Sequence, residues 1–285
     1  MELVTESFHP FRFQALQVDI ELLLRCEDKD ALIIEKLAVD WFRSAEKRFN
    51  RSLAESEINL LNTLAGEKCK VSNTMLEVLH LVEAYHTITA GGFLPHPSET
   101  QTWQVDPIQK SVMIPEHGTI DLGGIERSWS VKKLCDYMQR GMELKQGLIL
   151  AGGNITVWGR TLRNLDPWII GIQNPWNHAK VGAVALPQGS LSTCSKYEDP
   201  STKGSDVEQC TVVGEDIIEC QVWAKALCAL GLDVGIELLS KRATRCEAVL
   251  IGTNKEVHYI GSKDSLNRTW LDMTIDHYHF NREAS

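Results

Sequence analysis

Two stretches with paired glycines decide how this chain is interpreted: residues 120–128, which read IDLGGIERS, and residues 150–154, which read LAGGN. Each pair follows an apolar run, and a segment of helical character separates the two. Glycine lets the backbone adopt positive φ angles and approach a ligand closely. A helix that begins just after such a turn presents free N–H groups to an anion. The pattern therefore predicts a site for a phosphate-bearing ligand.

The composition is that of an acidic globular protein and argues against a nucleic-acid-binding function. Of 285 residues, 43% are hydrophobic and 24% are charged, and the net charge is −9. A negative net charge disfavours binding to nucleic-acid phosphates. No apolar run is long enough to span a bilayer, so we expect no membrane span. Residues 1–6 are acidic and lack the basic and apolar regions of a signal peptide, which predicts a cytoplasmic protein.

Metal and redox motifs are scarce in the sequence. The eight cysteines are scattered and form no CxxC pair, so neither a structural zinc site nor a redox motif is expected from them. Residues 276–279 (DHYH) are different, because His277 and His279 could offer two metal ligands on one face of a strand. The alternative interpretation of this segment is a plain C-terminal tail.

Helical and strand patterns mix without a strict βαβ rhythm. This mixture predicts an α+β fold, a mixed sheet with packed helices, in a single domain over residues 1–285. The apolar residues of 30–49 recur at helical spacing. Other helices are expected at 56–62, 73–89, 130–142, 215–230 and 233–241. Strands are expected at 11–24, 148–158, 168–173, 181–186, 209–213, 245–251 and 257–260, with a hairpin within 101–120.

The order of short motifs resembles that of the FAD:protein FMN transferase family, the flavin transferases formerly labelled thiamine-biosynthesis lipoproteins. Each motif is common by itself, and it is their shared order that makes the resemblance specific. The matching blocks are 46–51 (EKRFNR) with 56–58 (SEI) and 61–62 (LN), 89–93 (TAGGF), 120–125 (IDLGGI), 151–155 (AGGNI) with Gly159, 167–172 (PWIIGI) with Pro175, 191–197 (LSTCSKY), and 226–231 (ALCALG).

The resemblance implies a chemistry. Such proteins bind FAD, use magnesium, and attach FMN to a Thr or Ser hydroxyl of an acceptor protein while AMP leaves; some hydrolyse FAD instead. A metal neutralises pyrophosphate charge in this kind of transfer. The positions that the resemblance assigns to the flavin nucleotide are Ser56, Glu57, Gly123, Gly124, Arg127, Gly152, Gly153 and Thr193. Those that it assigns to the metal are Gly124, Gln221 and Lys225.

The departures from the family pattern fall on the chemistry. The metal-binding Asp and Thr of the family become Gln221 and Lys225, and a family Lys near the flavin becomes Arg127. An amide is a weak magnesium ligand, and a protonated lysine repels a cation. We therefore expect metal-dependent transfer to be lost or altered, which leaves open whether the chain is an enzyme.

Three functions remain open at this stage. The first is a residual or metal-altered flavin transferase or FAD hydrolase, and the second is a non-catalytic module that binds a flavin or a protein. The third is an interaction protein with an empty site. One hypothesis for Lys225 is that its ammonium takes the place of the metal and binds a phosphate; the alternative is a surface lysine on an amphipathic helix.

Overall fold

The computed structural model describes residues 6–93, 103–159, 166–177, 179–196, 202–242 and 245–280. Within them, a large mixed sheet has the strand order β1-β2-β6-β7-β10-β11-β12-β13-β15. Its neighbouring strands are antiparallel, except that β13 and β15 are parallel. Its strands are β1 (Glu6–Ala15), β2 (Val18–Glu27), β6 (Gly147–Ala151), β7 (Asn154–Trp158), β10 (Gly189–Ser195), β11 (Val207–Gly214), β12 (Glu247–Gly252), β13 (Val257–Gly261) and β15 (His277–Phe280).

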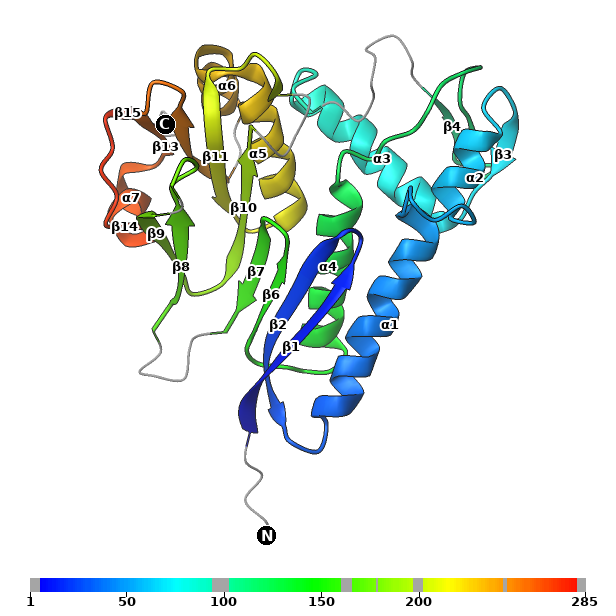
Figure 1. Cartoon of the computed structure of the whole chain (residues 1–285), viewed down its shortest axis with the longest axis horizontal. Coiled ribbons are helices and arrows are strands. Elements are labelled where there is room, and N and C mark those ends of the chain that lie inside the picture. Colours follow the sequence, from blue (N-terminus) through cyan, green and yellow to red (C-terminus); the bar gives the residue numbers. More distant parts are fainter. Residues whose placement is uncertain are drawn as a thin grey trace.

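Two small sheets accompany the large one in the described part of the chain. The first has the order β14-β9-β8 and packs on the large sheet, and the second has the order β3-β5-β4 and lies beside α2 and α3 (Figure 1). Their strands are β8 (Trp168–Gln173), β9 (Lys180–Leu186), β14 (Trp270–Leu271), β3 (Lys68–Lys70), β4 (Gln104–Asp106) and β5 (Ser111–Met113).

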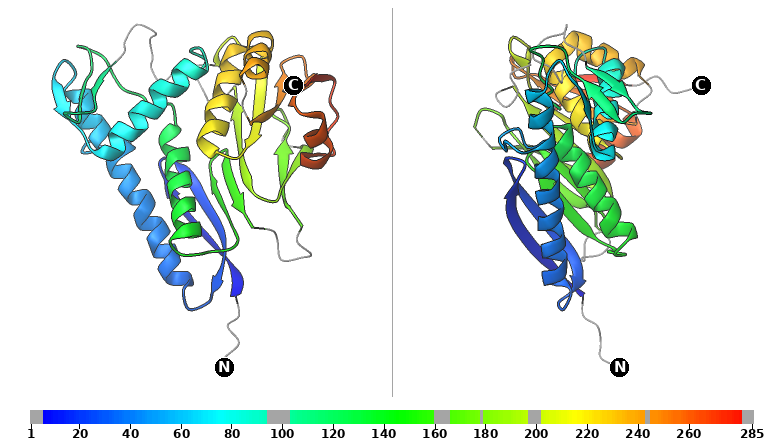
Figure 2. Two further views of the ribbon diagram at one scale, coloured as in Figure 1. Left: turned by 180° about the vertical axis from the view of Figure 1, so that it is seen from behind. Right: turned by 90° about the vertical axis from the view of Figure 1, so that its right-hand side faces the viewer.

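Helices α1, α4 and α5 lie on the other face of the large sheet, as the two further views in Figure 2 show, whereas α7 lies beside β9 and β14. α5 packs on β10 and β11, α4 on α5 and β6, and α1 on α4 and β1. No helix among the described residues has the length and apolar character to cross a membrane. The helices are α1 (Ala31–Phe49), α2 (Glu57–Thr63), α3 (Asn73–Ile88), α4 (Ile125–Arg140), α5 (Ile217–Leu230), α6 (Leu232–Lys241) and α7 (Lys263–Thr269).

The burial pattern explains these layers. In α1 the buried residues Ile34, Ala38, Phe42, Ala45 and Phe49 recur every three or four positions, as an amphipathic helix requires. β11 is buried at every position but its last, because α5 covers one face and the β8–β9–β14 sheet the other. The predicted α+β fold with a mixed sheet is confirmed, and the predicted helices are present with bounds that differ by a few residues.

Two predictions about local structure were wrong. Residues 11–24 are not one strand: β1 and β2 form a hairpin whose turn is Leu16-Gln17, with φ angles of 49° and 64°. Such a turn ordinarily uses Asn and Gly, so its sequence carried no turn signal. Residues 148–158 likewise form two strands, because Gly152 and Gly153 make the hairpin turn between β6 and β7. No helix begins after this second glycine pair.

Candidate functional site

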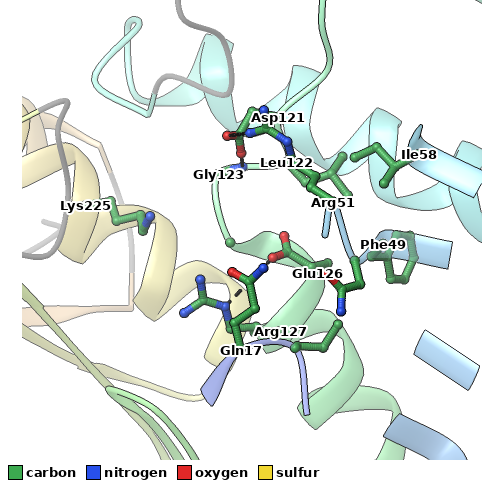
Figure 3. A pocket seen from close by; sticks show the side chains of 13 residues that line it. Gln17, Phe49, Arg51, Ile58, Asp121, Leu122, Gly123, Glu126, Arg127 and Lys225 are labelled. Carbon is green, nitrogen blue, oxygen red and sulfur yellow. Dashed lines mark hydrogen bonds and ion pairs between the residues drawn. The ribbon is translucent and has the colours of Figure 1, made fainter. Parts of the chain in front are cut away.

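A cavity of about 250 Å³ lies between the end of α1, the start of α4 and the β1–β2 turn (Figure 3). Its wall comes from the end of α1 and the loop after it, Ile58 of α2, the loop before α4, the first turn of α4 and one side chain of α5. Pockets for whole drug-sized ligands are usually about 300–1,000 Å³, so this cavity suits part of such a ligand. The lining residues are Leu16, Gln17, Phe49, Asn50, Arg51, Ile58, Asp121, Leu122, Gly123, Gly124, Glu126, Arg127 and Lys225.

The first glycine pair forms the tight turn that the sequence predicts. Gly123 and Gly124 have φ angles of +63° and +84°, and α4 begins at the next residue, with Gly124 as its N-cap. A Cβ atom on Gly123 would lie 2.8 Å from the Phe93 ring. No side chain caps α4, and in its first turn the Ile125 and Arg127 N–H groups donate to the carbonyls of Leu122 and Gly124. The predicted start at residue 130 was five residues late.

Gly124, Gln221 and Lys225 come together, as the resemblance implies for the metal positions. Gln221 Nε2 donates a 2.8 Å hydrogen bond to the Gly124 carbonyl. A Cβ atom on Gly124 would lie 2.8 Å from Gln221 Nε2 and 3.6 Å from Lys225 Nζ. Gln221 and Lys225 are four residues apart on α5 and therefore share one helix face. Figure 3 shows the Lys225 side chain extending from α5 toward the Gly123 turn.

This donor set does not suit magnesium. Mg²⁺ requires oxygen ligands in octahedral geometry, and a nearby ammonium repels it. The Gly124 carbonyl already accepts hydrogen bonds from Gln221 Nε2 and from the Arg127 backbone N–H. Gln221 Oε1 is buried without a hydrogen-bond partner, so one neutral oxygen remains. The side chains at this contact thus supply one weak ligand and one repelling charge.

Glu126 and Arg127 put two poorly satisfied charged groups beside the cavity. Glu126 Oε1 lies 3.8 Å from Arg127 Nε, which is too long for a hydrogen bond. Glu126 Oε2 and Arg127 Nε are buried and have no hydrogen-bond partner. Burial raises the pKa of the Glu126 carboxyl, while the positive charges of Arg127 and Lys225 oppose that rise. Unpaired buried polar atoms are costly, which is a reason to expect a ligand or water beside them.

Arg51 and Asp121 form an ion pair at the cavity rim that the sequence reasoning missed as site residues. Asp121 Oδ1 also accepts a 2.8 Å hydrogen bond from the Gly123 N–H, which fixes the turn. A signal was present, because both residues lie inside blocks of the family resemblance. What the sequence did not reveal was that a loop after α1 and a loop before α4 would meet.

The second glycine pair lies at a different cavity, of about 350 Å³, between the large sheet and β8. Gly152, Gly153 and Thr193 line it, whereas Gly124 and Lys225 do not. The structure thus places the predicted site residues at two cavities, with Gly124 and Lys225 at one and Gly152, Gly153 and Thr193 at the other. Gly153 approaches β10 so closely that a Cβ atom would lie 2.5 Å from the Thr193 carbonyl oxygen. The Thr193 hydroxyl is 3.0 Å from that of Thr211.

Ser56 and Glu57 make hydrogen bonds that stabilise the starts of α2 and α3. Ser56 is buried, and its Oγ accepts a hydrogen bond from the Asn59 N–H at the start of α2. Glu57 accepts hydrogen bonds from the backbone N–H and the hydroxyl of Ser72, at 2.6 and 2.8 Å, and so joins α2 to the N-cap of α3. Neither residue lines the cavity beside α4, although their neighbour Ile58 does.

Comparisons with known proteins agree with the architecture. A family model described as the ApbE family matches residues 94–207. A curated FAD:protein FMN transferase of Klebsiella pneumoniae (strain 342) is 24% identical over 173 residues. That match covers 54% of this chain and 52% of the relative, so the chain spans about half the length of the curated relative it matches.

Solved structures show the same fold over most of the chain. The ApbE protein of Thermotoga maritima MSB8 superposes with a TM-score of 0.79 at 18% identity, covering 88% of this chain and 96% of that one. The flavin transferase ApbE of Vibrio cholerae gives a TM-score of 0.76 at 16% identity, covering 90% and 97%. The mixed sheet and its helical layer are therefore those of these proteins.

Proposed function

We propose that this chain is a member of the ApbE family, whose model matches residues 94–207, and that its cavity beside α4 binds the phosphate part of a flavin nucleotide without a divalent cation. In the proposal the Lys225 ammonium supplies the positive charge that magnesium supplies elsewhere in the family. Transfer of FMN from FAD to a Thr or Ser of an acceptor protein is then lost or strongly reduced.

One observation carries the proposal: Gln221 donates to the Gly124 carbonyl and the Lys225 ammonium lies beside it. These are the positions that the resemblance assigns to the metal. A lysine can bind a phosphate as a point charge but cannot act as a ligand of a cation while protonated. The first turn of α4 and the Arg127 guanidinium line the same cavity and favour an anion there.

The consequence for chemistry follows from what a metal contributes to phosphoryl transfer. Bound magnesium would neutralise developing charge and orient the attacking and leaving oxygens. A lysine side chain can neutralise one charge, but it does not fix several oxygens in one geometry. The proposal is thus binding of FMN or FAD with weak turnover or none.

A residual metal-dependent flavin transferase or FAD hydrolase is the second candidate. It is favoured by the Asp121 and Glu126 carboxylates, which line the same cavity and are ligand types that magnesium prefers. Asp121 is already paired with Arg51, and burial raises the pKa of Glu126, so both are poorer ligands than two exposed carboxylates. We therefore rank this candidate below binding without a metal.

Release of AMP from FAD separates the two candidates. The protein is incubated with FAD and magnesium, with and without a threonine-containing peptide, and AMP is measured by chromatography. The proposal predicts no AMP above the protein-free blank, while equilibrium dialysis in the same buffer detects bound flavin. Magnesium-dependent AMP release would support the second candidate and contradict the first.

A paired substitution tests the assignment of the helix positions. The double variant Gln221→Asp, Lys225→Thr restores the family residue types, so it should make flavin binding dependent on magnesium. Lys47→Thr on the exposed face of α1 is the matched control and should change nothing. A double variant that still binds flavin equally well with and without magnesium would show that these positions do not contact the phosphates.

A further inference from the structure

A second group of polar side chains lies at the far edge of the large sheet, around β13 and β15. His258 on β13 faces His277 on β15 in the parallel register, and their rings stack with centroids 4.6 Å apart. Glu256 lies just before β13, and its Oε2 is 3.3 Å from His277 Nε2. Alternation along β15 puts His279 on the same face, with its Nε2 3.3 Å from His258 Nδ1.

The spacing of these side chains suits a small cation. One ligand atom each from Glu256, His258 and His277 lies within 4.8 Å of the others. Among the residues that the structure describes, this is the only group of three or more His, Cys, Asp or Glu side chains so arranged. In tetrahedral zinc sites with bonds of about 2.0–2.1 Å, ligand atoms are about 3.3 Å apart. The Glu256–His277 pair already has this separation.

One atom of this group is buried without a hydrogen-bond partner. His258 is 9% exposed, and its Nε2 is buried without a hydrogen-bond partner. When His258 Nδ1 donates to His279 Nε2, the lone pair of the ring is left on Nε2. Metal-binding histidines ordinarily fix their tautomer in this way, through a hydrogen bond from the other ring nitrogen.

We propose that Glu256, His258 and His277 bind a divalent transition cation of the zinc class, with His279 as the hydrogen-bond partner that orients His258. Two imidazoles and a carboxylate are a ligand set that zinc accepts, with a fourth position left to water. Magnesium prefers oxygen ligands and does not suit this set.

The bound cation joins the sheet edge to a short strand. β15 has four residues and pairs within the described chain with β13 alone. Glu256 and His258 come from the β13 side and His277 from β15, so one ion crosslinks both strands. A ligand that binds only the folded state stabilises it, and the effect grows with ligand concentration. The site lines neither of the cavities described above, so its role is to hold the sheet edge together.

Cobalt and zinc titrations of the chelator-treated, reduced full chain test this site. Co²⁺ should bind at one equivalent, with the visible absorption of a four-coordinate site and no thiolate-to-metal charge-transfer band, and Zn²⁺ should displace it. Zn²⁺ should also raise the melting temperature. The absence of a saturable one-equivalent site would overturn the proposal, and so would charge-transfer bands that identify cysteine ligands.

Two variants locate the ligands without disturbing the core. His277→Gln and Glu256→Gln change half-exposed side chains, and each should weaken zinc binding by about tenfold or more. The control is His80→Gln, which removes an exposed histidine that lies 3.5 Å from Glu83 in α3. Equal zinc affinity in His277→Gln and the parent chain would refute the assignment.

Discussion

Gly124 sits at the contact on which the proposed function depends. Its φ of +84° lies in the left-handed region, and its missing Cβ makes room for Gln221 Nε2. Gly124→Ala strains the backbone at this φ and places the new Cβ against Gln221 Nε2. A non-glycine residue in this conformation costs about 1–2 kcal/mol, and the contact adds to it. We predict a loss of about 2 kcal/mol in the free energy of unfolding, measured by urea denaturation, together with weaker flavin binding.

A second glycine provides the matched control for this substitution. Gly204 also has a positive φ, of +92°, but a Cβ atom there would meet nothing within 4 Å. Gly204→Ala should therefore show the backbone strain alone. If both variants lose the same free energy of unfolding, then the close contact between Gly124 and Gln221 does not add to the cost of the substitution.

Glu126 makes the stability of the protein dependent on pH. Because burial raises its pKa, the unfolded chain releases this proton near the ordinary value of 4.5 while the folded chain still holds it. The contribution of this group to stability is therefore fully present below that value and is lost as pH rises through the folded-state pKa. Glu126→Gln removes the ionisation, so the variant should melt higher than the parent at pH 8.

The difference in melting temperature should shrink as the pH is lowered to 4.5 and below. Glu55→Gln changes an exposed carboxylate and should show no such trend. A Glu126→Gln variant that is less stable than the parent at pH 8 would mean that the carboxylate is well paired in the folded protein.

At the residue scale, sequence reasoning identified part of the candidate site. The meeting of Gly124 with Gln221 and Lys225 could be anticipated, because residues four apart on a helix share a face and the family resemblance implies that this face meets the glycine turn. Arg51 and Glu126 were not anticipated as cavity residues, because their positions depend on how α1 and α4 pack. Periodicity reports which face of a helix is buried but not which loops meet at its end.

Among the elements, the β1–β2 hairpin combines an unusual turn with a place in the cavity wall. Leu16 and Gln17 both have positive φ, and both line the cavity. Two hydrogen bonds from the turn to other parts of the chain stabilise it. The Leu16 N–H donates to Glu46 Oε1, and the Gln17 side-chain amide donates to the Ser52 hydroxyl. Strained turns are common beside ligand sites.

Gln17→Gly should relieve the strain of this turn. Glycine adopts positive φ without a steric penalty, so the variant should gain about 1 kcal/mol in the free energy of unfolding, less the Ser52 contact. Gln14→Gly in β1 is the comparison, and it should lose stability because glycine weakens a strand. Urea denaturation of both variants checks the prediction, and a destabilised Gln17→Gly would contradict it.

The elements that could be predicted from sequence are those whose own residues carry the signal. The helix at 30–49 and that at 73–89 were confirmed, because buried residues at helical spacing define them. The β1–β2 turn was missed since neither Leu16 nor Gln17 is a turn residue. α7 and the short strand β14 were missed as well, because such short elements form mainly through contacts with neighbours such as β9. The strand interpretation of residues 276–279 agrees with β15.

At the scale of the whole molecule, the fold brings together two separate groups of polar side chains that we propose bind ligands. The helical layer holds the ammonium and guanidinium groups of Lys225, Arg51 and Arg127 around a glycine turn, and the far sheet edge holds a histidine cluster. The two can be tested independently, since the zinc variants touch no residue of the cavity. We predict that zinc raises the melting temperature without changing flavin affinity.

Calorimetric titration of FMN in EDTA and in magnesium shows whether Lys225 takes the place of a divalent cation. We expect the same affinity in both buffers for the parent chain. For Lys225→Gln we expect a loss of about tenfold, the order expected for a hydrogen bond to a charged group. Binding that requires magnesium, or that is unchanged in Lys225→Gln, would show that the lysine does not replace the cation.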